Sequence, residues 1–144
     1  MRMKNYNLER FITAHNRDYD IACNELKQGK KLSHWMWYIF PQIKGLGKSS
    51  TSEYYGIQSL DEAKAYINHP ILSNNMIKVC QVLLSLESNN PTEIFGRPDD
   101  MKLKSSMTLF SLAADDNRIF VRVLDKFYNG KLDNRTIRIV EKNM

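Results

Sequence analysis

The sequence predicts an all-α protein, a single multihelical domain over residues 1–144 with about seven short helices. Apolar residues recur at intervals of three and four positions along nearly the whole chain, which is the spacing of an amphipathic helix. No segment shows the sustained alternation of apolar and polar residues that marks a half-buried strand. The length, with 42% hydrophobic and 26% charged residues, suits one globular domain with its own core.

Two helices are predicted in the first 30 residues, over 8–15 and 19–26, each from one apolar stripe. The second stripe stops at Gly29, and glycine commonly follows the last residue of a helix. The stretch 30–56 breaks the pattern, because one proline and three glycines within it forbid a long helix. Irregular chain is expected there, and such loops often carry functional residues.

Two further helices are predicted in the middle of the chain. Ser59 followed by Glu62 is a capping box, which opens a helix over 60–67 that closes before Pro70. The longest apolar stripe of the sequence comes next and predicts a helix over 72–83.

The C-terminal third predicts one short turn and three helices. Asn90 with the proline after it has the pattern of a helix cap and first helical residue. A helix over 99–110 begins with two acids, which suit the positive end of the helix dipole. A further stripe covers 120–127, and Asp133 is placed to cap a last helix over 134–140.

The net charge of +5, from 21 basic and 16 acidic residues, is concentrated at the front of the chain. Residues 1–48 hold nine Lys or Arg and four Asp or Glu, and lysines without any acid flank the aromatic segment 34–40. Basic and aromatic side chains together attract phosphate and stack on planar rings, which indicates a nucleotide-like ligand or a nucleic acid. Lysines on a solvated face and tryptophans in the core are the alternative.

The sequence favours a cytoplasmic protein without a metal ion or cofactor. No apolar run reaches the roughly 18 residues of a membrane helix, and no apolar segment follows the basic N-terminus as in a secretory signal. Cys23 and Cys80 lie at apolar helical positions, as buried free thiols do. The three histidines have no partners at metal-ligand spacing.

The segment 45–50, Gly-Leu-Gly-Lys-Ser-Ser, is similar to part of a phosphate-binding loop. A Walker A loop needs a glycine five positions before its Gly-Lys-Ser, and Gln42 stands there. The third glycine of a dinucleotide-binding fingerprint would fall on Ser50. Two interpretations are left, a backbone that offers N–H groups to an anion and a plain turn.

Three residues are candidates for proton transfer, His34, Asp99 and Asp100. His34 has the chemistry of a general acid or base or of a phosphate hydrogen-bond donor, and the alternative is that it satisfies a nearby carbonyl. Adjacent carboxylates form an acid and base pair if one of them is desolvated, although helix capping explains Asp99 equally well.

Eight further residues are candidates for ligand binding, because they carry aromatic, basic or hydrogen-bonding side chains within two polar stretches, residues 30–56 and residues 97–106. They are Ser33, Trp35, Trp37, Gln42, Lys44, Lys48, Lys102 and Lys104. Trp35 or Trp37 would stack on a planar ring, and Lys44 or Lys48 would meet a phosphate. Ser105 and Ser106 interrupt an apolar stripe, so they either pack close to another element or face a pocket.

Four blocks of the sequence resemble a family known as domain of unknown function 1810, over nearly the full length. They run from Ser33 to Gln42, from Gly45 to Gly47, from Tyr66 to Leu72 and from Ile94 to Phe110. The resemblance implies a mainly helical fold, in agreement with the apolar stripes, and it implies no established activity.

The leading hypothesis is a pocket between the segment 33–42 and the helix that opens at Asp99. This pocket would take a phosphate-bearing, nucleotide-like small molecule, with hydrolysis or glycosidic cleavage as the reaction class to test first. The alternatives are a nucleic-acid-binding module that uses the lysines and a non-enzymatic interaction or scaffold domain. The sequence leaves open whether the protein is an enzyme and what its oligomeric state is.

Overall fold

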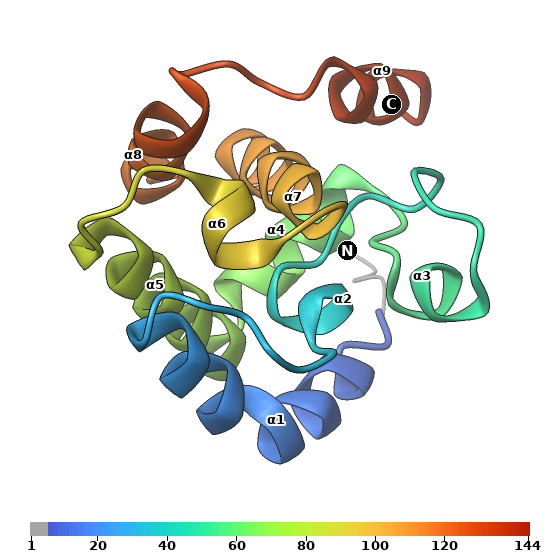
Figure 1. Ribbon diagram of the computed structural model, residues 1–144. Helices are drawn as coiled ribbons and strands as arrows, with labels where there is room; N and C mark the ends of the chain where they lie inside the picture. Colours follow the sequence, from blue (N-terminus) through green and yellow to red (C-terminus); the bar gives the residue numbers. More distant parts are fainter. Residues whose placement is uncertain (1–5) are drawn as a thin grey trace.

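Nine α-helices follow one another in the computed structural model, which describes residues 6–144 (Figure 1). They are α1 (Glu9–Lys27), α2 (Met36–Ile39), α3 (Ser50–Tyr55), α4 (Leu60–Asn68), α5 (Pro70–Ser85), α6 (Pro91–Phe95), α7 (Asp99–Ala113), α8 (Arg118–Tyr128) and α9 (Asn134–Lys142). No strand occurs within these described residues. The predicted all-α class is therefore confirmed.

The observed helices differ from the expected seven in three places, one of which is the predicted short turn after Asn90, which forms the five-residue helix α6. The stripes 8–15 and 19–26 form the single helix α1, because no glycine or proline separates them; the helix ends at Lys27, two residues before Gly29, whose φ is 79°. The stretch 30–56, expected to be irregular, contains the short helices α2 and α3. A helix of four or six residues presents too few periodic positions to be recognised from spacing.

The predicted caps form at the starts of α4 and α6, whereas Asp133 precedes α9 without making the expected side-chain capping hydrogen bond. The Ser59 hydroxyl accepts a hydrogen bond from the Glu62 amide at 3.2 Å, and α4 ends before Pro70. The Asn90 side chain accepts from the amides of Thr92 and Glu93 at the start of α6. These caps satisfy amide groups that the first turn of a helix leaves without a partner.

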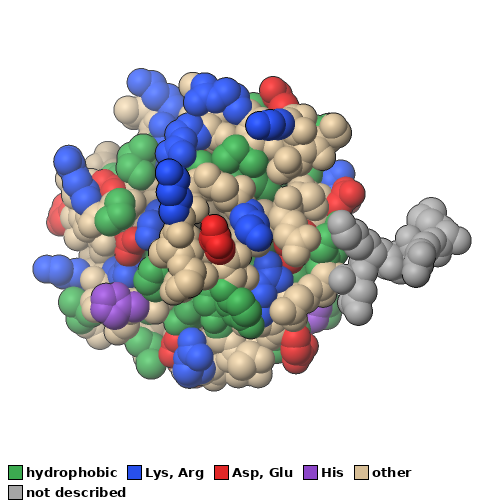
Figure 2. All heavy atoms as spheres, turned by 90° about the vertical axis from the view of Figure 1, so that its right-hand side faces the viewer, with side chains coloured by type: hydrophobic (Ala, Val, Ile, Leu, Met, Phe, Trp, Pro, Cys, Tyr) green, Lys and Arg blue, Asp and Glu red, His purple; other side chains and the backbone are tan. Residues whose placement is uncertain are grey.

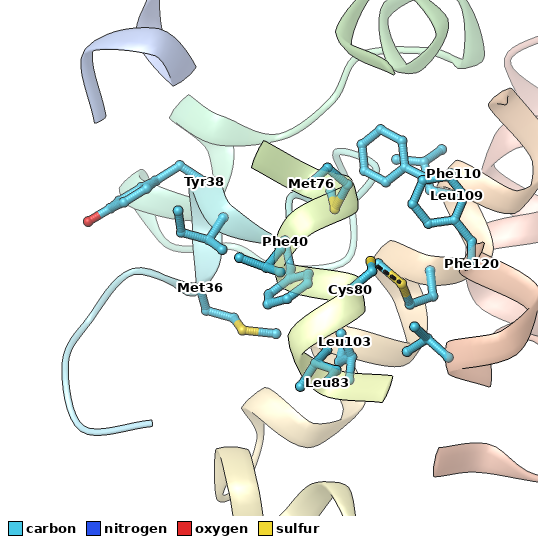
Figure 3. Packing of buried hydrophobic residues seen from close by; sticks show 14 of the residues in the cluster. Met36, Tyr38, Phe40, Met76, Cys80, Leu83, Leu103, Leu109, Phe110 and Phe120 are labelled. Atoms are coloured by element: carbon cyan, nitrogen blue, oxygen red, sulfur yellow. Dashed lines mark hydrogen bonds between the residues drawn. The ribbon is translucent and has the colours of Figure 1, made fainter. Parts of the chain in front are cut away.

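Helix α7 occupies the centre of the molecule and packs against α4, α6, α8 and α9 (Figure 1). Figure 3 shows buried apolar side chains of α7 packed against those of α2, α5 and α8. Cys80 donates to the sulfur of Met107 within this cluster, and both cysteines of the chain are buried and free, as predicted. A helix that is buried on most sides is a rigid base for residues at its exposed N-terminal end.

The loop between α2 and α4 is closed by a short parallel bridge between Ile43 and Ile57. The Lys44 amide donates to the Ile57 carbonyl at 2.7 Å, and the Ile57 amide donates to the Gln42 carbonyl at 2.8 Å. Glycine is required at position 56, since a Cβ there would lie 2.8 Å from that of Lys44. The bridge thus fixes both ends of the loop that carries the Gly-Lys-Ser segment.

Candidate functional site

A cavity of about 560 Å³ lies between this loop, α2, α3, the N-terminal half of α7 and the start of α9. Four sequence-predicted residues line it, namely Trp37, Gln42, Lys48 and Lys102. The two polar stretches singled out in the sequence therefore lie side by side. The volume is within the range of about 300–1,000 Å³ that small-molecule sites occupy.

Trp37 and Lys102 are in direct contact across the cavity wall. The Lys102 ammonium lies 5.1 Å from the centroid of the Trp37 ring, and it also pairs with Asp99 at 3.3 Å. A cation over an indole face is attracted by the negative charge of the π system. The contact joins α2 to the first turn of α7 and holds a positive charge at the cavity.

The glycine-rich loop forms the opposite wall. Gly45 has a φ of 112°, a conformation that side chains rarely adopt, and the space above it ends at Ile139 of α9. Ser49 caps α3 by accepting from the Ser52 amide at 3.1 Å. This loop presents Lys48 to the cavity, whereas the exposed Lys44 does not line it.

Trp35 is not available for stacking, which corrects one of the two expectations for the tryptophans. Its ring is 1% exposed, packs against Phe40 and Phe95, and donates its N–H to Glu25 at 2.9 Å. Trp37, two positions later, is half-buried and lines the cavity. Because α2 lies on the surface of the core, neighbouring positions on it point to different environments.

Glu25 organises the segment that precedes α2. Its carboxylate accepts hydrogen bonds from the amides of Leu32 and Ser33, from the Ser33 hydroxyl and from the Trp35 indole. Burial alone would raise the pKa of Glu25, but these hydrogen bonds to the charged form lower the pKa to about 2. Ser33 is therefore a structural residue, and it does not line the cavity.

The three candidates for proton transfer lie outside the cavity lining. His34 is exposed, and it is its backbone carbonyl that accepts from the Tyr38 hydroxyl at 3.1 Å. Asp99 is paired with both Lys31 and Lys102.

Asp100 is 6% exposed and accepts from the Thr92 hydroxyl at 2.6 Å, which ties α6 to α7. Lys104, the remaining candidate on α7, does not line the cavity either. Helix α7 has no side-chain capping hydrogen bond, so the expected capping role of Asp99 is wrong: Asp99 forms ion pairs, and Asp100 joins α6 to α7.

The cavity also contains residues that the sequence did not single out as ligand-binding. Arg135, at the first turn of α9, adds a third basic side chain. Asp133 adds a carboxylate that accepts from the Ser105 hydroxyl at 2.8 Å and from the Thr136 hydroxyl at 2.6 Å. Ser105 was expected to pack against another element or face a pocket, and it does both. No local pattern marks Arg135.

Basic side chains extend beyond the cavity over the same side of the molecule. Arg138 and Lys142 of α9 are exposed like Arg135, and Figure 2 shows basic side chains gathered over α9 at the upper edge of this face. Within residues 6–144 no helix is long and apolar enough to span a membrane. The same residues contain no group of three or more His, Cys, Asp or Glu placed to hold a metal ion.

Comparison with known proteins gives a family and a fold. A family profile described as "Protein of unknown function (DUF1810)" matches residues 5–140. The structure is similar to the crystal structure of the conserved hypothetical protein Rv1873 from Mycobacterium tuberculosis, with a TM-score of 0.92 and 43% sequence identity. That match covers 94% of this chain and 97% of the other. No curated protein matched the chain.

Proposed function

The chain belongs to the DUF1810 family, and we propose that the cavity beside Trp37 binds a small phosphate-bearing molecule with a planar, nucleotide-like ring. The observation that carries this proposal is that three basic side chains, Lys48, Lys102 and Arg135, and one accessible indole line the same cavity. An activity is not part of the proposal, because the residues considered for proton transfer do not line the cavity.

The charge of the cavity supports an anionic ligand. Neither Lys48 nor Arg135 has an ion pair within 4.0 Å among the described residues. Lys102 is paired with Asp99 at 3.3 Å, and Asp133 is the single acid among the lining residues, so the charges of Lys48 and Arg135 are left for a ligand. Like charges that share a hollow repel one another, and a phosphate relieves that repulsion while gaining charge-assisted hydrogen bonds.

The remaining lining supports a planar group on the same ligand. Trp37 and Tyr55 supply aromatic surface, and Leu46, Pro98 and Met101 supply aliphatic surface. Flat rings stack on an indole with a favourable energy of about 1–3 kcal/mol. A molecule with a phosphate at one end and a ring at the other matches this division into basic and apolar lining.

The test is a thermal-shift screen of the protein with nucleoside monophosphates, ADP-ribose and sugar phosphates at millimolar concentration. A ligand at 100 times its dissociation constant stabilises the folded state by about 2.7 kcal/mol, which raises the melting temperature measurably. No shift with any of these compounds would overturn the proposal.

Matched pairs of variants locate the binding. Lys48→Gln is expected to weaken binding of the ligand found in the screen at least fivefold, whereas Lys44→Gln leaves it unchanged because Lys44 does not line the cavity. On α9, Arg135→Gln should weaken binding, whereas Arg138→Gln should leave it unchanged, because both arginines are exposed but only Arg135 lines the cavity. Equal effects within each pair would indicate a nonspecific charge effect and not binding in the cavity.

A second candidate function is nucleic-acid binding, which the basic side chains gathered on α9 beside the cavity favour. Lys48 and Arg135 line one cavity, and Arg138 and Lys142 prolong the basic surface along α9. Binding to a duplex or single strand through this surface would weaken steeply with salt, with a slope set by the number of phosphates neutralised. A flat salt response would remove this candidate and, with a negative ligand screen, would favour an interaction or scaffold domain.

A further inference from the structure

We infer that Asp133 recognises vicinal hydroxyl groups of the ligand, so that the cavity selects a ribose-type phosphate over its deoxy counterpart. The inference rests on the proposed function and deepens it by naming the part of the ligand that the acidic side of the cavity takes. It concerns the one lining residue whose charge opposes the rest of the site.

Asp133 is held in a fixed position by three residues from two helices, α7 and α9. Its Oδ2 atom accepts hydrogen bonds from Ser105 of α7 and Thr136 of α9, and its amide donates to the Thr108 hydroxyl at 2.9 Å. Burial opposes ionisation, but the hydrogen bonds from Thr136 and Ser105 hold the pKa of Asp133 below its usual range. The carboxylate is therefore ionised at neutral pH and is preorganised as an acceptor.

Both hydroxyl donors bond to the Oδ2 atom, and no cation lies within 4.0 Å of Asp133 among residues 6–144. The amides of Thr136 and Arg135 also stabilise the charged carboxylate, but Asp133 makes no side-chain capping hydrogen bond to the first turn of α9. A carboxylate oxygen accepts about two hydrogen bonds, so Oδ1 has acceptor capacity for a ligand. The charged lining residues determine which ligand group can lie next to Oδ1 of Asp133. A phosphate would be repelled by Asp133, and an ammonium group would be repelled by Lys48, Lys102 and Arg135.

A neutral hydroxyl is the donor that satisfies both conditions. Two adjacent hydroxyls on a sugar ring reach both lone pairs of one carboxylate oxygen or both of its oxygens, which a single hydroxyl does not. Acidic side chains bind ribose diols in this way in other nucleotide-binding folds. The ligand would then place its ring at Trp37, its phosphate near Lys48 and Arg135, and its sugar hydroxyls at Asp133.

The test compares two probes that share ring and phosphate, adenosine 5′-monophosphate and its 2′,3′-dideoxy counterpart, by titration calorimetry with the whole protein. The dideoxy compound is expected to bind at least tenfold more weakly, which is the loss of a hydrogen bond to a charged group. In Asp133→Asn, which keeps an acceptor for Ser105 and Thr136, this ratio should fall towards one. Asp115→Asn, an exposed acid outside the cavity, should keep the ratio of the unaltered protein.

The outcomes separate this inference from the proposed function. If both probes bind equally to the unaltered protein, the inference is wrong and the phosphate site stands. If neither binds, both are wrong. Thermal melting reports whether Asp133→Asn folds; if it does not, the two probes on the unaltered protein decide. Ser105→Ala then serves as the second variant, because losing a positioning hydrogen bond should lower the discrimination without removing the carboxylate.

Discussion

Replacing Glu25 by alanine is expected to destabilise the protein by about 2–3 kcal/mol and to weaken ligand binding at the same time. Four hydrogen bonds end on its carboxylate, from two backbone amides, the Ser33 hydroxyl and the Trp35 indole. The two amides lie at a loop that water can reach, so their loss costs little. The indole N–H of Trp35 is buried, and a buried donor left without a partner costs about 1–3 kcal/mol.

Glu25→Gln separates the charge of the carboxylate from its hydrogen bonds. The amide oxygen of glutamine can replace Oε1, which accepts from Leu32, Ser33 and Trp35, and its NH2 group can donate to the Ser33 hydroxyl. The loss should therefore be about 1 kcal/mol, less than half that of the alanine variant. Asp20→Ala, an exposed position on the same helix, is the control and should stay within about 0.5 kcal/mol of the unaltered protein.

The same residue gives the protein an acid-dependent stability. The pKa of Glu25 is about 2 in the folded protein against 4.5 for an unperturbed glutamate, so the unfolded chain binds more protons in this interval. The stabilisation is complete above pH 4.5 and is lost as the pH falls towards 2. Urea unfolding at pH 3 and pH 7 measures it, and Glu25→Gln should show a smaller difference between the two.

Either of two results would contradict this role of Glu25. One is a loss below 0.5 kcal/mol in the alanine variant, which would mean that the indole finds another partner. The other is a glutamine variant as unstable as the alanine variant, which would mean that charge and not hydrogen bonding holds the segment before α2. Ligand affinity, measured on the folded fraction, tests the link to Trp37, which lies in the helix that this segment positions.

Three further predictions concern the core. Acrylamide should quench Trp37 but not Trp35, so Trp37→Phe should leave an unquenched, blue emission, and strong quenching in that variant would contradict the burial of Trp35. Arg10→Met should lower the free energy of unfolding by about 3–5 kcal/mol, because it leaves the buried Glu62 carboxylate without its cation. Adding Glu62→Gln, which removes that charge, should restore part of the free energy of unfolding measured by urea denaturation. Burial lowers the pKa of His15 more than its bond to the Tyr38 carbonyl raises it, so stability should be full above about pH 6.5 and decrease below it. Urea midpoints that do not change between pH 5 and pH 8 would refute this.

Much of the helical architecture follows from local sequence signals. The caps at Ser59 and Asn90 act within three residues, so the sequence places the starts of α4 and α6 correctly, although the Glu62 carboxylate accepts from the Gln58 amide and not from that of Ser59. Helices α2 and α3 are not predicted, because four and six residues are too few to show a helical spacing of apolar positions. The union of two stripes into α1 also escapes, since polar residues between stripes look the same in a turn and on the exposed face of a helix.

The candidate site is predictable only in part. The sequence gives the chemistry of each side chain, but the residues that surround it depend on how distant segments pack together. Trp37, Lys48 and Lys102 were identified from their chemistry and do line the cavity. The sequence could not distinguish Trp35 from Trp37, since the difference depends on a hydrogen bond to Glu25 and on packing against the core. Nor could it foresee that Lys31 and Lys102 pair with Asp99.

Arg135 illustrates the limit most clearly, because it is an ordinary exposed arginine on an amphipathic helix. Its place at the cavity depends on α9 lying against the glycine-rich loop, where Ile139 reaches to within 3.6 Å of the position a Gly45 Cβ would take. A contact between segments so far apart in the chain produces no recognisable pattern in the sequence of either segment.

The contact between α9 and this loop has a consequence for the newly made protein. A ribosome releases the wall that carries Gly45 long before it releases the one that carries Arg135. Until α9 has emerged and docked, the nascent polypeptide lacks Asp133 and Arg135 from the lining of the proposed site. A chain stalled before residue 133 would then bind the ligand more weakly than the chain that carries α9.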